Sequence, residues 1–127
     1  GVGSFWHSRN MEIPNAVTAL SALAHAGRLE IFRLLVRAGP EGMAAGEIAR
    51  ATDSLPNTLS TNLGILAAAG LVASRREGRS IIYTAAYDRM GELLTFLMED
   101  CCAGRPEVCA PVSEIAGRAC AAGRATC

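Results

Sequence analysis

The chain has 127 residues, about the size of one domain, and half of them are hydrophobic, which is enough to build a core and excludes a fully disordered protein. Basic and acidic residues balance at 12 each, so the net charge indicates neither a nucleic-acid nor a membrane partner. Aromatic residues make up only 5%, and the many alanines and leucines favour a mainly α-helical fold.

The first ten residues, which precede Met11, show no helical periodicity, and we interpret them as a disordered lead-in or a cloning remnant. The sequence has no run of 18 uncharged apolar residues, and its N-terminus lacks the pattern of a secretory signal peptide. We therefore expect a cytoplasmic protein with no membrane partner.

Two apolar stripes at helical spacing come next. The first stripe consists of Val17, Leu20, Leu23 and Ala24. The second stripe consists of Leu29, Phe32, Leu35 and Val36. This spacing predicts two helices that bury these side chains in the core, the second of which ends at Gly39-Pro40. His25 lies at the junction of the two helices, where we expect a packing or capping role.

A short third helix is predicted over Glu47–Ala51, and Ser54 is the expected N-cap of a fourth helix from about Leu55 to Ala69, which Gly70 ends. The fourth helix carries short polar side chains on its predicted exposed face, namely Asn57, Thr58, Ser60, Thr61 and Asn62. Its leucines are expected to turn inward, namely Leu59, Leu63 and Leu66.

Two β-prone runs follow, Leu71–Arg76 and Ser80–Thr84, around a turn at Glu77-Gly78. They predict a hairpin whose tip carries Arg75, Arg76 and Arg79. About five helices with such a hairpin are typical of a winged helix-turn-helix, in which the helix at 55–69 enters the major groove of DNA. Asn, Ser and Thr side chains reach base edges or phosphates, and arginines suit phosphates or the minor groove. We therefore predict that these five polar side chains and three arginines contact double-stranded DNA.

A last amphipathic helix is predicted from its apolar residues Met90, Leu93, Leu94, Leu97 and Met98. We assign residues 11–100 to one winged-helix domain for DNA binding and dimerisation, and residues 101–127 to a cysteine-containing tail. Cys101, Cys102 and Cys109 lie close together just past the predicted helix. Thiolates prefer soft ions, and three of them complete the pyramidal shell of trivalent arsenic, whereas structural zinc needs four donors.

Other uses of these thiols stay open at this point. A fourth ligand from Cys120 or a partner subunit would make a zinc or cadmium site, and a disulfide from Cys109 to Cys101 or Cys102 would make a redox switch. An enzyme with a phosphate-cradling Cys-x5-Arg loop is disfavoured, because the sixth position after each of these cysteines is Glu107, Val108 or Ile115. We therefore expect no enzymatic activity.

From about Val17 to Cys109 the sequence resembles the ArsR/SmtB family of metal- and metalloid-responsive repressors. The resemblance rests on residues 20–35, 46–49, 54–72 and 75–83. It implies a homodimer whose first and last helices form the interface, and an operator complex that dissociates when the inducer binds.

Two departures from the family narrow the resemblance. The segment Met43–Glu47 lacks the Cys-Val-Cys of well-known arsenic sensors, and Asp88–Glu99 lacks the histidines of the zinc sensors. What remains resembles the branch with an adjacent Cys pair and a third Cys after the last helix, which is associated with trivalent arsenic and antimony. The resemblance therefore implies a repressor released by As(III) or Sb(III) bound to Cys101, Cys102 and Cys109.

Overall fold

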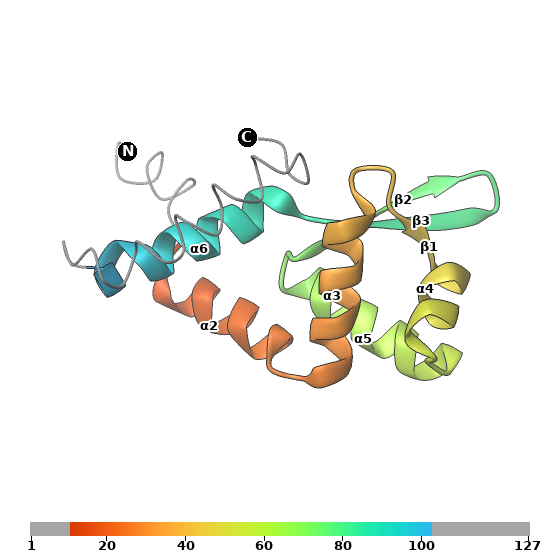
Figure 1. Cartoon of the computed structure of the whole chain (residues 1–127), viewed down its shortest axis with the longest axis horizontal. Coiled ribbons are helices and arrows are strands. Elements are labelled where there is room, and N and C mark those ends of the chain that lie inside the picture. Colours follow the sequence, from red (N-terminus) through yellow and green to blue (C-terminus); the bar gives the residue numbers. More distant parts are fainter. Residues whose placement is uncertain (1–10, 103–127) are drawn as a thin grey trace. The chain divides into compact units, whose positions relative to one another are not determined.

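The computed structural model describes residues 11–102, which form five helices and three strands. The helices are α2 (Ile13–Leu23), α3 (Ala26–Ala38), α4 (Ala45–Thr52), α5 (Pro56–Ala68) and α6 (Tyr87–Cys102). The strands are β1 (Met43–Ala44), β2 (Val72–Glu77) and β3 (Ser80–Ala85), as Figure 1 shows. This element order confirms the predicted mainly α winged helix-turn-helix fold.

The chain divides into two compact units, Gly1–Leu93 and Leu94–Cys127. Helices α2 to α5, the sheet and the first part of α6 belong to the first unit, and the rest of α6 belongs to the second. The predicted lead-in at residues 1–10, and the predicted tail beyond its first two residues, lie outside the described part. In that described part, every helix is too short or too polar to cross a membrane.

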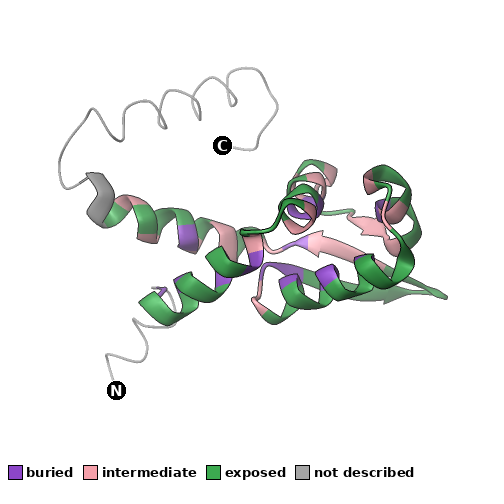
Figure 2. Cartoon of the chain, turned by 90° about the horizontal axis from the view of Figure 1, so that it is seen from below, coloured by how far each residue is buried: buried purple, intermediate pink, exposed green. Residues whose placement is uncertain are grey.

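The core of the first unit is aliphatic and lies between the helices and the sheet. Its fully buried side chains are Ile31, Leu35, Ile48, Leu66 and Leu71. Helix α3 contacts α2, α4, α5 and strand β3, so it occupies the centre of this unit, and Figure 2 shows the buried positions along the inward faces. Each fully buried side chain of this kind stabilises the fold by about 1.5–3 kcal/mol.

Helix α2 buries alanines instead of its larger apolar residues. Ala16, Ala19 and Ala22 are between 0% and 3% exposed, whereas Val17 and Leu20 are 54% and 41% exposed. Small side chains let the α2 backbone pack closely against α3 and α5, and both sets of residues have helical spacing. The predicted helix is thus confirmed, but the prediction that Val17 and Leu20 lie in the core is wrong. Leu29 of α3 is likewise exposed.

His25 caps α3, as predicted. Its Nδ1 atom accepts hydrogen bonds from the backbone N–H groups of Gly27 and Arg28 at 3.1 Å and 3.4 Å. These are two of the donors that the first turn of a helix leaves without a partner inside the helix. Arg28 Nε in turn donates to the carbonyl of Ala22 at 2.6 Å, which fastens α3 to the end of α2.

The sheet has the order β1-β3-β2, and all its pairings are antiparallel. Strand β1 was not predicted, because its two residues are too few to show an alternating pattern. The hairpin between β2 and β3 is confirmed, with its turn at Gly78-Arg79, one residue later than predicted. Gly78 supplies the positive φ of 62° that two-residue hairpin turns require.

Helix α6 begins beside the end of α3 and runs further than predicted. The hydroxyl of Tyr87 donates to the carbonyl of Val36 at 3.1 Å, which ties the start of α6 to the last turn of α3. Cys101 and Cys102, predicted to follow the helix, are its last two residues. The backbone of these two cysteines is therefore helical.

Replacing His25 by alanine is expected to lower the free energy of unfolding by about 1 kcal/mol, because the first turn of α3 loses its side-chain acceptor. Urea denaturation followed by circular dichroism measures this change. His25→Asn is the matched control, because asparagine is a good N-cap and should retain most of the stability. Equal stabilities of the alanine variant and the wild type would contradict the capping role.

Candidate nucleic-acid interface

Helices α4 and α5 form a helix-turn-helix with a three-residue connection, Asp53–Leu55. Asp53 has a φ of 52°, a left-handed conformation that short polar residues tolerate. The N–H group of Ser54 donates to the carbonyl of Ala49 at 3.0 Å, and the hydroxyls of Thr52 and Ser54 lie 2.7 Å apart. These bonds close the connection tightly and fix the angle at which α5 leaves it.

Ser54 is not the N-cap of α5, contrary to the prediction. Its hydroxyl bonds to Thr52, and the N-cap position is occupied by Leu55, followed by Pro56 at the first helical position. Helix α4 also differs from the prediction, since it begins at Ala45, two residues early. There the carboxylate of Glu47 accepts a hydrogen bond from the Ala44 N–H group at 2.9 Å.

The inward face of α5 agrees with the prediction. Leu59, Leu63 and Leu66 are at most 3% exposed, and Ile48 of α4 is fully buried. Contacts of α5 with α2, α3, α4 and β2 surround this face. The opposite face of α5 is therefore the one that a ligand can approach (Figure 2).

Four of the five predicted polar residues lie on that exposed face, namely Asn57, Thr58, Ser60 and Thr61. Asn62 does not, because only 6% of it is exposed, and it is the one buried polar residue in the part of the chain that the structure describes. A Cβ atom built on Gly27 would lie 3.3 Å from the Asn62 amide nitrogen, so Asn62 faces the start of α3. The prediction that Asn62 lies on the exposed face, where it would read DNA, is thus wrong.

The sequence does contain the signal for this correction. Leu59, Asn62 and Leu63 stand at i, i+3 and i+4, and Leu66 completes the pattern at i+7, which is the buried stripe of a helix. Asn62 was assigned to the polar face from its chemistry, although its position belongs to the buried stripe.

Leu55 belongs to the candidate interface although the sequence did not predict it. It is 73% exposed at the N-cap of α5, the end of the helix that contacts bases in helix-turn-helix proteins. An apolar side chain in this place can contact a thymine methyl group. Its spacing from Leu59 predicts a buried residue, and only the start of α5 at Pro56 turns Leu55 outward.

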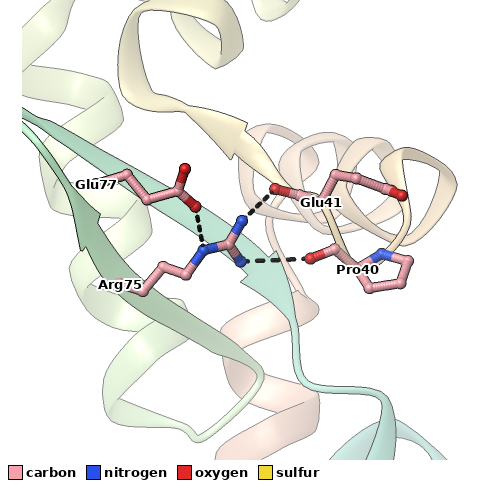
Figure 3. A network of polar contacts seen from close by, with 4 residues as sticks. All are labelled: Pro40, Glu41, Arg75 and Glu77. Carbon is pink, nitrogen blue, oxygen red and sulfur yellow. Dashed lines mark hydrogen bonds and ion pairs between the residues drawn. The ribbon is translucent and has the colours of Figure 1, made fainter.

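The three arginines of the wing differ in their surroundings. All three are exposed, but among the described residues Arg76 and Arg79 have no hydrogen-bond or ion-pair partner. Arg75 makes three contacts, which Figure 3 shows: its Nε atom lies 2.5 Å from Glu77 Oε2, Nη1 donates to the Pro40 carbonyl at 3.3 Å and Nη2 to the Glu41 carbonyl at 2.7 Å. Arg75 was predicted as a DNA contact, but the structure engages its guanidinium within the protein.

The predicted thiol site is described only in part. Cys101 and Cys102 end α6, and Cys109 lies outside the described residues. Among residues 11–99, whose side chains the structure describes, no group of three His, Cys, Asp or Glu side chains would bind a metal. The grouping of the three cysteines therefore stays a prediction.

Comparisons with known proteins agree with this geometry. A family described as a helix-turn-helix domain matches residues 23–75, from the end of α2 into β2. The biofilm growth-associated repressor of Agrobacterium fabrum is 36% identical over 84 residues, which are 66% of this chain and 69% of that protein. The uncharacterized HTH-type transcriptional regulator Rv0081 of Mycobacterium tuberculosis is 40% identical over 73 residues, 57% of this chain.

A solved structure is similar over most of the described part. It is the homodimeric winged helix-turn-helix DNA-binding domain of Mb0332 from Mycobacterium bovis, a possible ArsR-family transcriptional regulator. Its TM-score is 0.56 at 31% identity, and the match covers 77% of this chain and 85% of that one.

The chain spans 61% of the length of Rv0081 and of the equally similar regulator from a second strain of the same species.

Asn62→Ala is expected to lower the free energy of unfolding by roughly 1 kcal/mol, because it removes packed atoms between α5 and the start of α3. Thr61→Ala, at the neighbouring exposed position, should leave stability within about 0.5 kcal/mol of the wild type. Urea denaturation of the two variants makes the comparison. An Asn62→Ala protein as stable as the wild type would show that the Asn62 side chain does not stabilise the fold.

Proposed function

Because this chain belongs to the ArsR family of winged helix-turn-helix transcriptional regulators, we propose that it represses transcription by binding double-stranded operator DNA as a homodimer. The observation that carries the proposal is the exposed face of α5, which presents Asn57, Thr58, Ser60 and Thr61 beside the arginine-bearing hairpin. A relative that is named as a repressor supports the proposal that this chain represses transcription and does not activate it.

In this proposal α5 enters the major groove. The amide of Asn57 pairs with an adenine edge, and the hydroxyls of Thr58, Ser60 and Thr61 reach bases or phosphates. Arg76 and Arg79 of the wing contact phosphates or the adjacent minor groove. The phosphate contacts provide affinity that salt weakens, and the contacts of α5 provide sequence preference.

An exposed apolar face on α2 supports the homodimer. Ile13, Val17 and Leu20 stand at i, i+4 and i+7 and are 68%, 54% and 41% exposed. A hollow of about 460 Å³ between α2 and α5 adjoins this face, and Val17 and Ile65 contribute to its lining. Leu94 and Leu97 of the second unit are also largely exposed on α6. We propose that a second copy covers these surfaces, and the similar Mb0332 domain, which is itself homodimeric, supports a dimer.

We further propose that As(III) or Sb(III) is the inducer, bound by the thiolates of Cys101, Cys102 and Cys109. A ligand shifts an equilibrium only if it binds one state more tightly, so the metalloid must favour a dimer that fits DNA poorly. Cys101 and Cys102 are the last two residues of α6. Binding of Cys109 to the same metalloid pulls on this end of the helix. Zinc or cadmium binding, and disulfide formation, are the alternative uses of the same thiols.

A gel-shift assay with the DNA upstream of the protein's own coding sequence tests the function. The expected complex contains a dimer that protects an inverted repeat with half-sites about 34–36 Å apart. Titrating this complex with arsenite, antimonite, zinc, cadmium and peroxide separates the proposed inducer from its alternatives. Absence of a specific complex on upstream fragments and on a random-sequence library would refute the proposal.

Arg79→Ala is expected to weaken binding to specific and to random duplexes alike, because a phosphate contact is electrostatic and independent of sequence. The slope of log affinity against log salt should become less steep by roughly one for each phosphate that the variant no longer neutralises. Fluorescence anisotropy at several salt concentrations measures both effects. Thr61→Ala is the control on α5, since it should alter sequence preference and leave the salt slope unchanged.

Serine substitution at Cys101, Cys102 or Cys109 should preserve repression and weaken or abolish release by arsenite. Coupling of about 1–3 kcal/mol corresponds to a change in operator affinity of roughly 5- to 150-fold, which should be absent from these variants. An operator-release titration on each variant measures the effect, with Cys120→Ser and Cys127→Ser as controls that respond normally. Full release of the Cys102→Ser and Cys109→Ser proteins would overturn the assignment of the thiols.

A further inference from the structure

The connection from α3 to β1 is a tight turn, Gly39–Gly42. The N–H group of Gly42 donates to the carbonyl of Gly39 at 3.1 Å, and proline in the second position with glycine in the fourth is favoured in such turns. This bond uses the carbonyl of Gly39. The carbonyls of Pro40 and Glu41, in the middle of the turn, need partners from elsewhere in the protein or from water.

Gly42 brings this turn directly against strand β3. Its φ is 72°, and a Cβ atom built there would lie 2.4 Å from the Tyr83 carbonyl oxygen and 2.8 Å from a methyl carbon of Ile82. Only glycine fits so close an approach. The turn therefore lies over the strand that pairs with β2 of the wing.

Arg75 supplies the missing partners. It stands on β2 opposite Ile82, and its side chain reaches to the turn, where two nitrogens of the guanidinium donate to the Pro40 and Glu41 carbonyls. The third contact is with Glu77, two residues along β2 and so on the same face of the strand. One planar guanidinium thus joins the wing, its own strand and the turn before β1 (Figure 3).

We propose that Arg75 is a positioning residue, which holds the wing at a fixed angle to the helix-turn-helix and does not itself contact DNA. This inference rests on the proposed function. To reach a phosphate, the guanidinium would have to leave two backbone carbonyls and a carboxylate, all of which accept charge-assisted hydrogen bonds. Arg76 and Arg79, which have no such partners among the described residues, are the wing cations that meet DNA.

The proposal predicts that lysine cannot replace arginine at position 75. A phosphate contact depends mainly on charge, and lysine is itself a common phosphate binder. The contacts of Arg75 need several N–H groups held in one plane, which the ammonium group of lysine cannot provide. Arg75→Lys should therefore loosen the wing and weaken DNA binding, even though the net charge is unchanged.

Two measurements on Arg75→Lys, with Arg79→Lys as the matched control, test the proposal. Without DNA, amide hydrogen exchange in residues 72–85 should become about tenfold faster in Arg75→Lys and stay unchanged in Arg79→Lys. With the duplex that binds the wild-type protein, Arg75→Lys should weaken binding about tenfold at an unchanged salt slope, because the protein still neutralises the same phosphates. Arg79→Lys keeps a cation at the wing tip, so its binding should weaken less than that of Arg75→Lys, at the same salt slope.

The outcomes separate the two proposals. Wild-type protein that binds no duplex refutes the proposed function, while the exchange experiment still tests the hold of Arg75 on the wing. Wild-type affinity of Arg75→Lys, combined with a less steep salt slope in Arg75→Ala, would identify Arg75 as a phosphate contact and overturn the inference. Unchanged hydrogen exchange in Arg75→Lys would overturn it as well, because the wing would then keep its order without the guanidinium.

Discussion

The burial of one leucine stripe on α5 is the constraint on which the rest of the structure depends. Leu59, Leu63 and Leu66 pack against α3 and α4 and leave the solvent almost completely. Because a helix has only one such face, this burial decides which side chains of α5 point outward. The three-residue connection from α4 and the contacts with β2 then set the position of α5 relative to the wing.

Much of this arrangement follows from periodicity and turn chemistry. The repeat of leucines predicts α5 and its inward face, Gly70 ends the helix, and Gly78 marks the hairpin. The sequence was less informative where one residue type serves two purposes. Asn62 has the chemistry of a base-reading residue and the position of a core residue, and burial decided the outcome.

The sequence misplaced the large apolar residues of α2 and did not indicate the partners of Arg75 within the protein, and both results have a common physical cause. Val17 and Leu20 are apolar enough for a core, but alanines on the neighbouring face allow closer packing, and the larger residues remain exposed at the surface. Arg75 has the charge expected of a DNA contact, but the carbonyls of Pro40 and Glu41 lie within its reach. Whether a side chain finds such a partner depends on which segments meet in space. Strand β1 has only two residues, so the sequence did not indicate that the turn before it lies beside the wing.

The short hairpin turn and the bonds of Arg75 also bear on the entropy of association. A wing that is loose in the free protein loses conformational freedom when it docks, and each immobilised long side chain costs about 0.5–1.5 kcal/mol. Here the strands are joined by two residues, and the guanidinium anchors the wing to a turn closed by its own hydrogen bond. Most of that freedom is already lost when the chain folds. In the proposed complex with DNA, a wing ordered in this way loses little further freedom, and more of the interaction energy remains as affinity.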